Sequence, residues 1–593
     1  MFRTFKARCG HHLRAAAGAV MLATLAACGG GGGDGAAGEV AGVAEGTPSV
    51  PPTRAEALRF LTQATFGPTD ADVDRVMAIG YAAWIDEQIA RPASSHRAYW
   101  DAENAARRAA DPSDSAGQRE VLDSFYRQAL LGPDQLRQRV AYALSQIFVV
   151  SMVDSNVGGN PQGVAGYLDM LGANAFGSYR TLLEQVARHP MMGMYLSHLR
   201  NMKEDPARGR VPDENFAREV MQLFSIGLYQ LEPSGALKLG SDGKAVETYT
   251  AADVAGLAKV FTGWSYDGPD TADGRFWGWS EELQSPSRMY TPMQGYSQFH
   301  SLTEKKFLGA TVPAQSRADP SASLKTAMDT LAAHPNVGPF IGRQLIQRLV
   351  TSNPSPAYVA RVAQAFQAGG GDMKAMVKAV LLDAEARDAT TAAGATYGKL
   401  REPVLRLTAF LRAYGATSDS GKFLIGNTSD NGTQLGQTPL AAPSVFNFYR
   451  PGYVAPGSTS GAAGLAAPEL QIAHETTAAA WVNYMRDNVA SGTGATNGVV
   501  NGQTLNRRDI RPDFTAELAL ATDATALVDR VAQRLTYGSM GATAKTDIAT
   551  AVATLAIPAS TGSNQAAIDT AKRNRVNAAV LLVLVSPEFQ VLK

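Results

Sequence analysis

Apolar residues recur at helical spacing along almost the whole chain after Thr53, and this periodicity is the feature that most limits the possible folds. The segments that show it are 53–67, 136–151, 178–199, 325–334, 339–350, 356–370, 374–387, 403–415 and 577–592. Thr53, with Glu56 three residues later, has the pattern of a capping box at a helix start. Alternating β-branched residues are scarce. The sequence therefore predicts a mainly α protein with one large multi-helix domain over residues 53–593.

Two segments depart from the helical pattern. Residues 237–250 place Asp242-Gly243 between short runs that contain Leu, Val and Tyr, which is typical of a β-hairpin turn. We therefore expect a small hairpin insertion within residues 230–300. The Gly-, Ser- and Asn-rich stretch at 488–508 is of low complexity, and we expect a flexible loop there.

The N-terminus has the pattern of an export signal. The first 14 residues carry four basic side chains and no acidic one, and residues 15–27 are apolar and small. This apolar run is too short to span a bilayer. It ends in Leu-Ala-Ala-Cys at residues 25–28, which resembles a bacterial lipobox. We expect residues 1–28 to be a lipoprotein signal peptide with lipidation at Cys28, and residues 29–52 to be a Gly/Pro-rich disordered tether. Ordinary signal-peptide cleavage nearby is the alternative.

Composition limits the remaining function classes. The only cysteines are Cys9 and Cys28, so the exported domain has no disulfide, thiol nucleophile or thiolate metal site. The formal net charge is zero, which gives no electrostatic basis for nucleic-acid binding. No apolar run after Cys28 is long enough to span a membrane. We therefore expect an exported protein, anchored to the outer membrane through lipid alone and facing either the periplasm or the cell surface.

Several blocks carry a specific family resemblance. They read RHPMMGMYLSHLRN at 188–201, PDENFAREVMQLFSIGLY at 212–229, DVAGLAKVFTGWSY at 253–266 and HPNVGPFIGRQLIQRLV at 334–350. These blocks resemble the DUF1800 family, a group of exported bacterial proteins whose biochemical function is not established. The resemblance implies one long, mostly helical domain. Relatives are often encoded beside sulfatase-like DUF1501 proteins, which makes such an exported protein a candidate partner.

The 212–227 block contains the candidate catalytic residues. Asp213 suits a helix N-cap, and Asn215, Arg218, Glu219 and Gln222 would share one polar face of the helix that follows. One interpretation is a structural ion-pair network. The other makes Glu219 a general acid/base or ligand, with Arg218 holding an anionic substrate and Asp213 or Glu214 assisting.

No cofactor is predicted, but two metals stay open as alternatives. The 200–214 loop is rich in carboxylate and amide oxygens, as calcium requires, although it lacks the EF-hand pattern and contains bases that neutralise its acids. His189, His300 and His334, together with Glu219, are the weak candidates for a zinc site. These histidines have no local zinc motif, and structural roles are the alternative for each.

Aromatic residues beside polar ones suggest a site for sugars. Trp264, Tyr266 and Trp277 lie in one segment. Asn447, Tyr449 and Arg450 lie in another that we expect to line the same groove. Aromatic faces stack on sugar rings, and the neighbouring polar groups bond to hydroxyls. The alternative is that Trp264 belongs to the core and the other residues fix a long loop.

Two classes of function follow from the sequence. The first is a cell-envelope binding or accessory protein for a polysaccharide or for an exported partner enzyme. The second is a hydrolase or lyase that acts on envelope or environmental polymer, with Glu219 and Arg218 at its centre. The chain lacks the nucleophile elbow, the phosphate-binding loop and the zincin motif, and this favours the first class.

Overall fold

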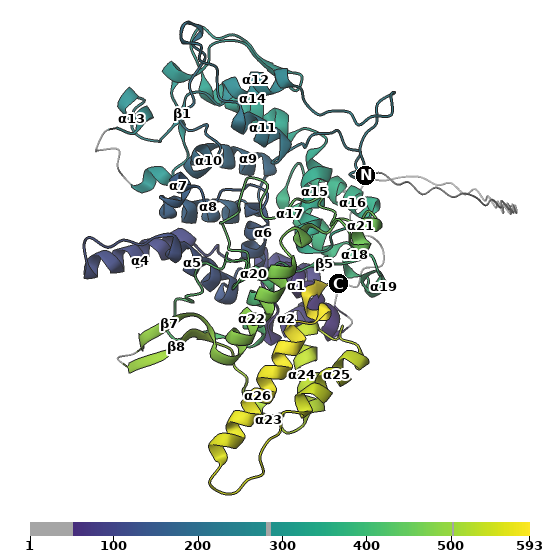
Figure 1. The fold of residues 1–593 in the computed structure, drawn as a ribbon. Coiled ribbons are helices and arrows are strands. Elements are labelled where there is room, and N and C mark those ends of the chain that lie inside the picture. Colours follow the sequence, from purple (N-terminus) through teal and green to yellow (C-terminus); the bar gives the residue numbers. More distant parts are fainter. Residues whose placement is uncertain (1–50, 52, 280–285, 501–502) are drawn as a thin grey trace, which may run out of the picture. The chain divides into compact units, whose positions relative to one another are not determined.

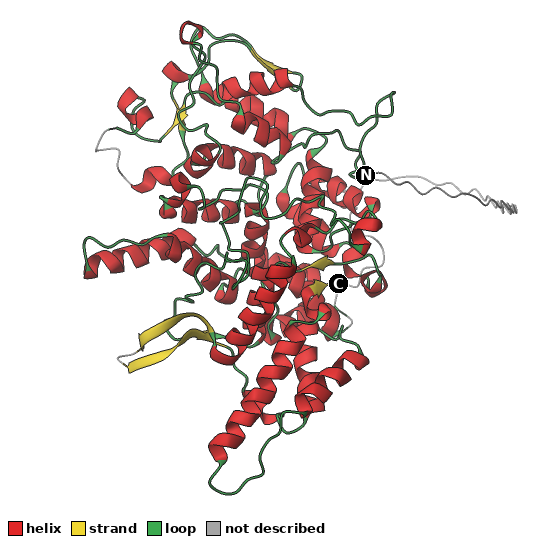
Figure 2. Cartoon of the chain, in the orientation of Figure 1, coloured by secondary structure: helices red, strands yellow, loops and turns green. Residues whose placement is uncertain are grey.

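The structure, a computed structural model, describes residues 51, 53–279, 286–500 and 503–593. Helices dominate this part of the chain, and its sheets have only two or three strands (Figure 2). The predicted mainly α fold is therefore confirmed. The predicted signal peptide, Cys28 and most of the predicted tether lie outside the described residues. Among the described helices, none combines the length and the apolar character needed to cross a bilayer.

The first half of the described chain is a series of short helices (Figure 1). They are α1 (Arg54–Ala64), α2 (Asp70–Ile79), α3 (Tyr81–Ala90), α4 (His96–Ala110), α5 (Gln118–Leu131), α6 (Gln135–Ser145), α7 (Ser155–Gly158), α8 (Pro161–Ala173), α9 (Tyr179–Arg188), α10 (Pro190–Tyr195), α11 (Asn215–Gln222), α12 (Ala251–Val260) and α13 (Asp273–Trp277). The Thr53 side chain accepts a hydrogen bond from the Glu56 amide, as the capping pattern predicts. The predicted 178–199 helix is divided into α9 and α10, because Pro190 has no backbone N–H to donate within a continuous helix.

The second half continues with helices whose starts are often marked by proline. They are α14 (Pro320–Ala332), α15 (Val337–Leu349), α16 (Pro356–Ala368), α17 (Met373–Leu382), α18 (Ala384–Arg387), α19 (Ala389–Ala393), α20 (Pro403–Ala413), α21 (Thr459–Ala462), α22 (Glu475–Ser491), α23 (Thr515–Ala519), α24 (Ala524–Thr536), α25 (Ala542–Ala553), α26 (Gln565–Leu584) and α27 (Pro587–Gln590). Helices α24, α25 and α26 pack side by side (Figure 1).

The strands form small antiparallel sheets. Strand β1 (Trp264–Ser265) pairs with β2 (Gln294–Gly295), β3 (Lys305–Phe307) with β4 (Ala310–Val312), and β5 (Lys399–Leu400) with β9 (Val591–Leu592). The three-stranded sheet has the order β6 (Thr417–Ser418), β8 (Gln503–Arg511), β7 (Thr493–Val500). The hairpin expected near Asp242-Gly243 is present as isolated bridges, which join Leu239 to Ala245 and Tyr229 to Glu247.

The segment 488–508 differs from the sequence-based expectation of a flexible loop. Helix α22 continues to Ser491, and β7 and β8 occupy most of the rest of this segment. Thr493 pairs with Ile510, which in turn pairs with Ser418 of β6. Gly and Asn lower the strand propensity of β7, but backbone pairing with β8 overrides composition here.

Two hydrophobic cores organise the described helices. The first core takes residues from α1–α4, α8–α12 and α14–α17, and the second from α20, α22 and α24–α26. Helices α5 and α6 contribute to both, since Val121 belongs to the first core and Phe125 to the second. The turn between α1 and α2 also joins them, with Leu61 in the first core and Phe66 in the second.

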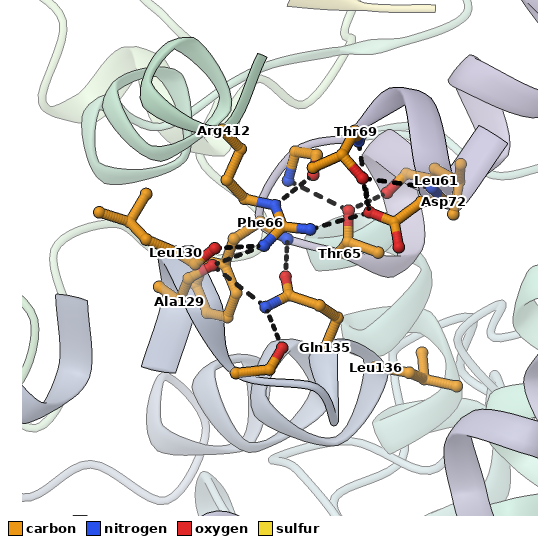
Figure 3. Close-up of polar contacts among 12 residues, drawn as sticks. Leu61, Thr65, Phe66, Thr69, Asp72, Ala129, Leu130, Gln135, Leu136 and Arg412 are labelled. Atoms are coloured by element: carbon orange, nitrogen blue, oxygen red, sulfur yellow. Dashed lines mark hydrogen bonds and ion pairs between the residues drawn. The ribbon is translucent and has the colours of Figure 1, made fainter. Parts of the chain in front are cut away.

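A buried arginine of α20 holds this α1–α2 turn in place (Figure 3). Arg412 donates from Nε to the Gly67 carbonyl at 2.5 Å, from Nη1 to the Leu130 carbonyl at 2.6 Å, and from Nη2 to Asp72 at 2.9 Å. Gly67 has a φ of 137°, and a Cβ there would lie 2.5 Å from the Cα of Ala409, so a glycine is required. Arg412 thus fixes the turn against both α5 and α20.

Candidate functional site

A groove of about 550 Å³ lies between the C-terminal end of α11, helix α15 and the loop 445–452. We call it the Gln–Arg groove, because its polar lining is Gln146, Gln222, Gln344, Gln347, Arg343, Arg348 and Arg450. Its apolar lining is Ile147, Leu223, Leu228, Leu231, Leu237, Pro339, Phe340, Val445, Phe446 and Pro451. Within the described part of the chain, no acidic, histidine, lysine, hydroxyl or thiol side chain lines this groove.

Helix α15 supplies the floor of the groove through helical spacing. Arg343 and Gln344 lie four and three residues before Gln347, so each shares a face of α15 with it. The opposite face carries Ile341 and Leu345, which are buried in the first core. This division explains how a largely apolar helix presents a polar stripe to the groove.

The segment 226–231 forms the wall opposite the floor, and hydrogen bonds join it to Asn336 at the start of α15. The Asn336 amide nitrogen donates to the carbonyls of Ile226 at 2.7 Å and Tyr229 at 2.8 Å. Its amide oxygen accepts a hydrogen bond from the Leu231 backbone at 3.0 Å. Gly227 has a φ of 71°, and a Cβ there would lie 2.8 Å from the ring of Phe340. The 226–231 segment is therefore held at a defined distance from α15.

The floor carries polar atoms that the described protein does not satisfy. Nε2 of Gln344, Oε1 of Gln347 and Oε1 of Gln146 are buried and have no hydrogen-bond partner among the described residues. All three side chains belong to residues that are at most 7% exposed. Each buried polar atom left unpaired costs about 1–3 kcal/mol. Because the atoms themselves are buried, a ligand recovers this free energy when its binding turns these side chains toward the groove.

Two exposed arginines stand at the groove. Arg343 forms no hydrogen bond or ion pair with a described residue, and burial of part of its side chain lowers its pKa. The Arg450 guanidinium lies over the ring of Phe446, 4.7 Å from its centroid. Because no carboxylate lines the groove, these charges are available to an anionic group of a ligand.

Behind the floor lies a buried hydrogen-bond network centred on Glu402. Its Oε2 accepts from Tyr142 at 3.1 Å, Gln146 at 2.7 Å, Gln437 at 2.5 Å and Tyr449 at 3.1 Å. Glu402 thereby holds the amide nitrogen of Gln146, a residue that lines the groove. Burial, followed by the charge of Glu402, raises the pKa of Tyr449 well above its usual value.

The three polar residues predicted near 447–450 therefore have different places. Arg450 lines the groove, whereas Tyr449 is buried against Glu402. Asn447 is also buried, with a φ of 63°, a conformation that asparagine adopts more easily than most residues.

The predicted catalytic residues of α11 do not line the Gln–Arg groove. Glu219 is buried, its Oε2 has no hydrogen-bond partner in the described chain, and burial raises its pKa. Arg218 pairs with Glu214 at 3.3 Å on an exposed surface. Asp213 accepts hydrogen bonds from the Asn215 amide at 2.8 Å and the Ser197 hydroxyl at 3.0 Å. Of the predicted polar face, only Gln222 reaches the groove.

The tryptophan-rich segment lies outside the groove lining as well. Trp264 is buried and donates from Nε1 to the Val260 carbonyl at 3.1 Å. Tyr266 is buried beneath the Arg288 guanidinium. Trp277 stacks on Trp279 with ring centroids 5.4 Å apart, and Trp279 is 75% exposed. The two aromatic segments thus do not share this groove.

The metal candidates have protein partners where the structure describes them. Nδ1 of His189 accepts from the Met191 amide, and Nδ1 of His334 accepts from the Asn336 amide. His300 bonds to the Thr262 carbonyl at 2.8 Å and the Ser323 hydroxyl at 3.0 Å. Across residues 51, 53–279, 286–500 and 503–593, no three His, Cys, Asp or Glu side chains converge as a metal site requires.

The floor residues of α15 were not singled out from the sequence. Gln344, Gln347 and Arg348 lie in the block 334–350 that carries the family resemblance. The signal that would have found them is a polar stripe with i, i+3 and i+4 spacing in an otherwise apolar helix.

Comparison with known families gives one match. A family model described as a protein of unknown function (DUF1800) matches residues 59–591, so the chain belongs to this family. No curated protein and no solved structure matches it.

Proposed function

For this member of a family of unknown function, we propose a role as a cell-envelope binding or accessory protein that takes an extended segment of an exported partner protein in the Gln–Arg groove. One observation carries the proposal: the groove combines apolar walls with amide and guanidinium groups, and no acid, histidine or nucleophile lines it in the described chain. Such a lining supports recognition, whereas hydrolysis or elimination needs a general acid, a base or a metal.

The polar floor complements a peptide backbone. Nε2 of Gln344 is a free donor, and Oε1 of Gln146 and Oε1 of Gln347 are free acceptors. A peptide offers a carbonyl and an amide at every residue, so it meets both kinds of group at once. The apolar walls then contact its side chains, as in other grooves that bind extended peptides.

The charge of the groove selects among peptides. Arg343 and Arg450 lack acidic partners, so a carboxylate on the bound segment pairs with them. We therefore propose an apolar segment that carries Asp, Glu or a C-terminal carboxylate. A DUF1501-like exported protein is the partner that the family resemblance suggests.

A polysaccharide is the second candidate ligand, at a different place. Trp279 is exposed and stacks on Trp277, an arrangement that suits a sugar ring. The groove itself offers only the aromatic rings of Phe340 and Phe446, which is a weaker basis for sugar stacking.

Affinity measurements with peptides test the proposal. Acidic apolar peptides and their neutral amide counterparts are titrated against the purified chain, and a set of glycans is titrated in parallel. We expect Gln344→Leu to weaken peptide binding about tenfold, since a lost hydrogen bond to a buried group costs about 1.4 kcal/mol. Arg218→Gln is the matched control, because Arg218 lies outside the groove lining. Equal peptide affinity in wild type and Gln344→Leu would reject the groove as the site. Glycan binding that is lost in Trp277→Ala would instead support the second candidate.

A further inference from the structure

A small internal cavity lies behind the α1–α2 turn, and cationic side chains surround it. Its volume is about 10 Å³, the space of about one water-sized particle. Its polar lining consists of Arg139 of α6, Arg348 of α15, Lys399 of β5, the neighbouring Arg401, and Thr62 and Thr65. The four cationic residues are each at most 4% exposed. No acidic side chain lines the cavity in the described chain.

The positive charge around this cavity is not balanced by the described protein. Lys399 forms a buried ion pair with Glu469 at 2.8 Å. Arg139, Arg348 and Arg401 form no ion pair with any residue that the structure describes. The nearby buried Glu402 receives its hydrogen bonds from the uncharged side chains of glutamines and tyrosines. Even with Glu402 counted against one guanidinium, an excess of buried positive charge remains, and unpaired buried charge is costly.

The same arginines have nitrogen atoms that lack hydrogen bonds. Nε and Nη1 of Arg139, Nε of Arg348, and Nε and Nη1 of Arg401 are buried without a partner in the described chain. Arg412 provides a comparison within the same fold, because it donates from Nε, Nη1 and Nη2 to two carbonyls and Asp72 (Figure 3). Arg412 is therefore satisfied internally, whereas the three arginines around the cavity, like Arg387 elsewhere in the fold, are not.

In the described chain, the threonine hydroxyls of the cavity accept no hydrogen bond from the unpaired arginine nitrogens. Thr62 donates to the Leu58 carbonyl at 2.8 Å, and Thr65 donates to the Leu61 carbonyl at 2.6 Å. Both hydroxyls are thus already directed to α1 backbone. The wall that they form is rigid, since Arg412 holds the adjoining turn through Gly67.

We propose that this cavity binds one small monovalent anion, a halide such as chloride. A halide accepts several N–H hydrogen bonds and also offsets the excess positive charge. A water molecule can accept hydrogen bonds but carries no charge to offset it. A halide is smaller than sulfate or phosphate, so it suits this small cavity better than either oxyanion. The ion joins α6 and α15 to the β5–α20 segment and so stabilises the junction between the first and second cores.

Thermal unfolding of the full chain tests the proposal. The Tm is measured at fixed ionic strength while chloride replaces gluconate, with fluoride, bromide and sulfate in parallel. We expect chloride at about a hundred times its Kd to raise the Tm by about 2 °C, because the ion binds only the folded state. Bromide should act like chloride, and sulfate at equal ionic strength should act like gluconate.

A matched pair of variants on α6 locates the effect. Arg139→Gln should abolish the difference in Tm between chloride and gluconate. Arg137→Gln should retain the difference, because Arg137 does not line the cavity, although it donates hydrogen bonds to nearby carbonyls. Crystals grown in bromide should show an anomalous peak among the three guanidinium groups, and this readout does not depend on whether the variants fold. Equal Tm values in chloride and gluconate, or a water molecule in place of the bromide peak, would overturn the proposal.

Discussion

The Tyr449 hydroxyl donates a 3.1 Å hydrogen bond to Oε2 of Glu402, and both side chains are buried. This bond joins the loop 445–452, one wall of the Gln–Arg groove, to the start of α20. The same carboxylate oxygen orients Gln146 on the groove floor. The aromatic residue expected to contact ligand therefore acts through the carboxylate that shapes the site.

Tyr449→Phe should destabilise the protein by about 1.5–3 kcal/mol, the range for a hydrogen bond to a charged group. Urea unfolding midpoints of the variant and the wild type measure the change. Tyr453→Phe in the same loop serves as the control, because its hydroxyl makes no hydrogen bond with a described residue. Similar midpoints for Tyr449→Phe and the wild type would mean that the hydrogen bond between Tyr449 and Glu402 contributes little to the free energy of unfolding.

Acidification should destabilise the fold through His198. Burial lowers the pKa of this histidine to about 4, whereas an unfolded histidine has a pKa of about 6.5. Between these two values the unfolded state binds the extra proton, so stability falls as the pH decreases from about 6.5 to 4, by about 3 kcal/mol in total. The imidazole also stacks on Phe216 at 3.8 Å.

Denaturation curves over this pH range measure the effect. His198→Gln should reduce the slope of stability against pH in the same window, while the buried His189 and His300, whose pKa values burial lowers to about 3 and about 4, should retain part of it. A slope that is as steep in His198→Gln as in the wild type would assign the pH dependence to other groups.

The titration of Glu219 should change stability in the opposite direction, with stability falling as the pH rises. Burial raises its pKa above the usual value, so the unfolded state loses its proton first as the pH rises. The resulting loss of stability extends from the unfolded pKa up through the raised folded pKa. Glu219→Gln removes this titration and should be more stable relative to wild type at pH 8 than at pH 4, as thermal unfolding at the two pH values would show.

Peptide affinity of Glu219→Gln should equal that of the wild type, since Glu219 does not line the groove. Loss of a polymer-degrading activity in Glu219→Gln, with the fold intact, would instead support the hydrolase or lyase interpretation.

Lipidation is tested at Cys28, which lies outside the described residues. Labelled palmitate should enter the wild-type chain in cells and should not enter Cys28→Ser. Separation of membrane fractions should place the wild type with the outer membrane. Equal labelling of the two chains would contradict the proposed lipid anchor, and with it the attachment of the chain to the envelope through Cys28.

Much of the helical framework is predictable from local patterns. The capping residues Thr53 and Thr69 mark the starts of α1 and α2, and Pro190 accounts for the break between α9 and α10. These signals are local, because a cap or a proline acts within one turn of the chain. The β7–β8 hairpin was missed because its stability depends on pairing between strands and with β6, which composition does not record.

The candidate site was predictable only in part. Gln222 and Arg450 came from segments that the sequence singled out, and they meet in the groove. Their neighbours Gln344 and Arg348 look from the sequence like ordinary polar residues on an amphipathic helix. Whether such residues face solvent, a groove or an internal cavity depends on which helix packs against them, and helical periodicity contains no information on that choice.

The sequence by itself determined the helical class, many helix starts and the family, and it predicts an exported lipoprotein. The tertiary structure alone decided that Tyr449 is buried against Glu402 and that three arginines surround one small cavity. The physical reason is the range of the forces involved. Caps and periodicity act over a few residues, whereas burial and electrostatic pairing depend on contacts between segments that lie far apart in the chain.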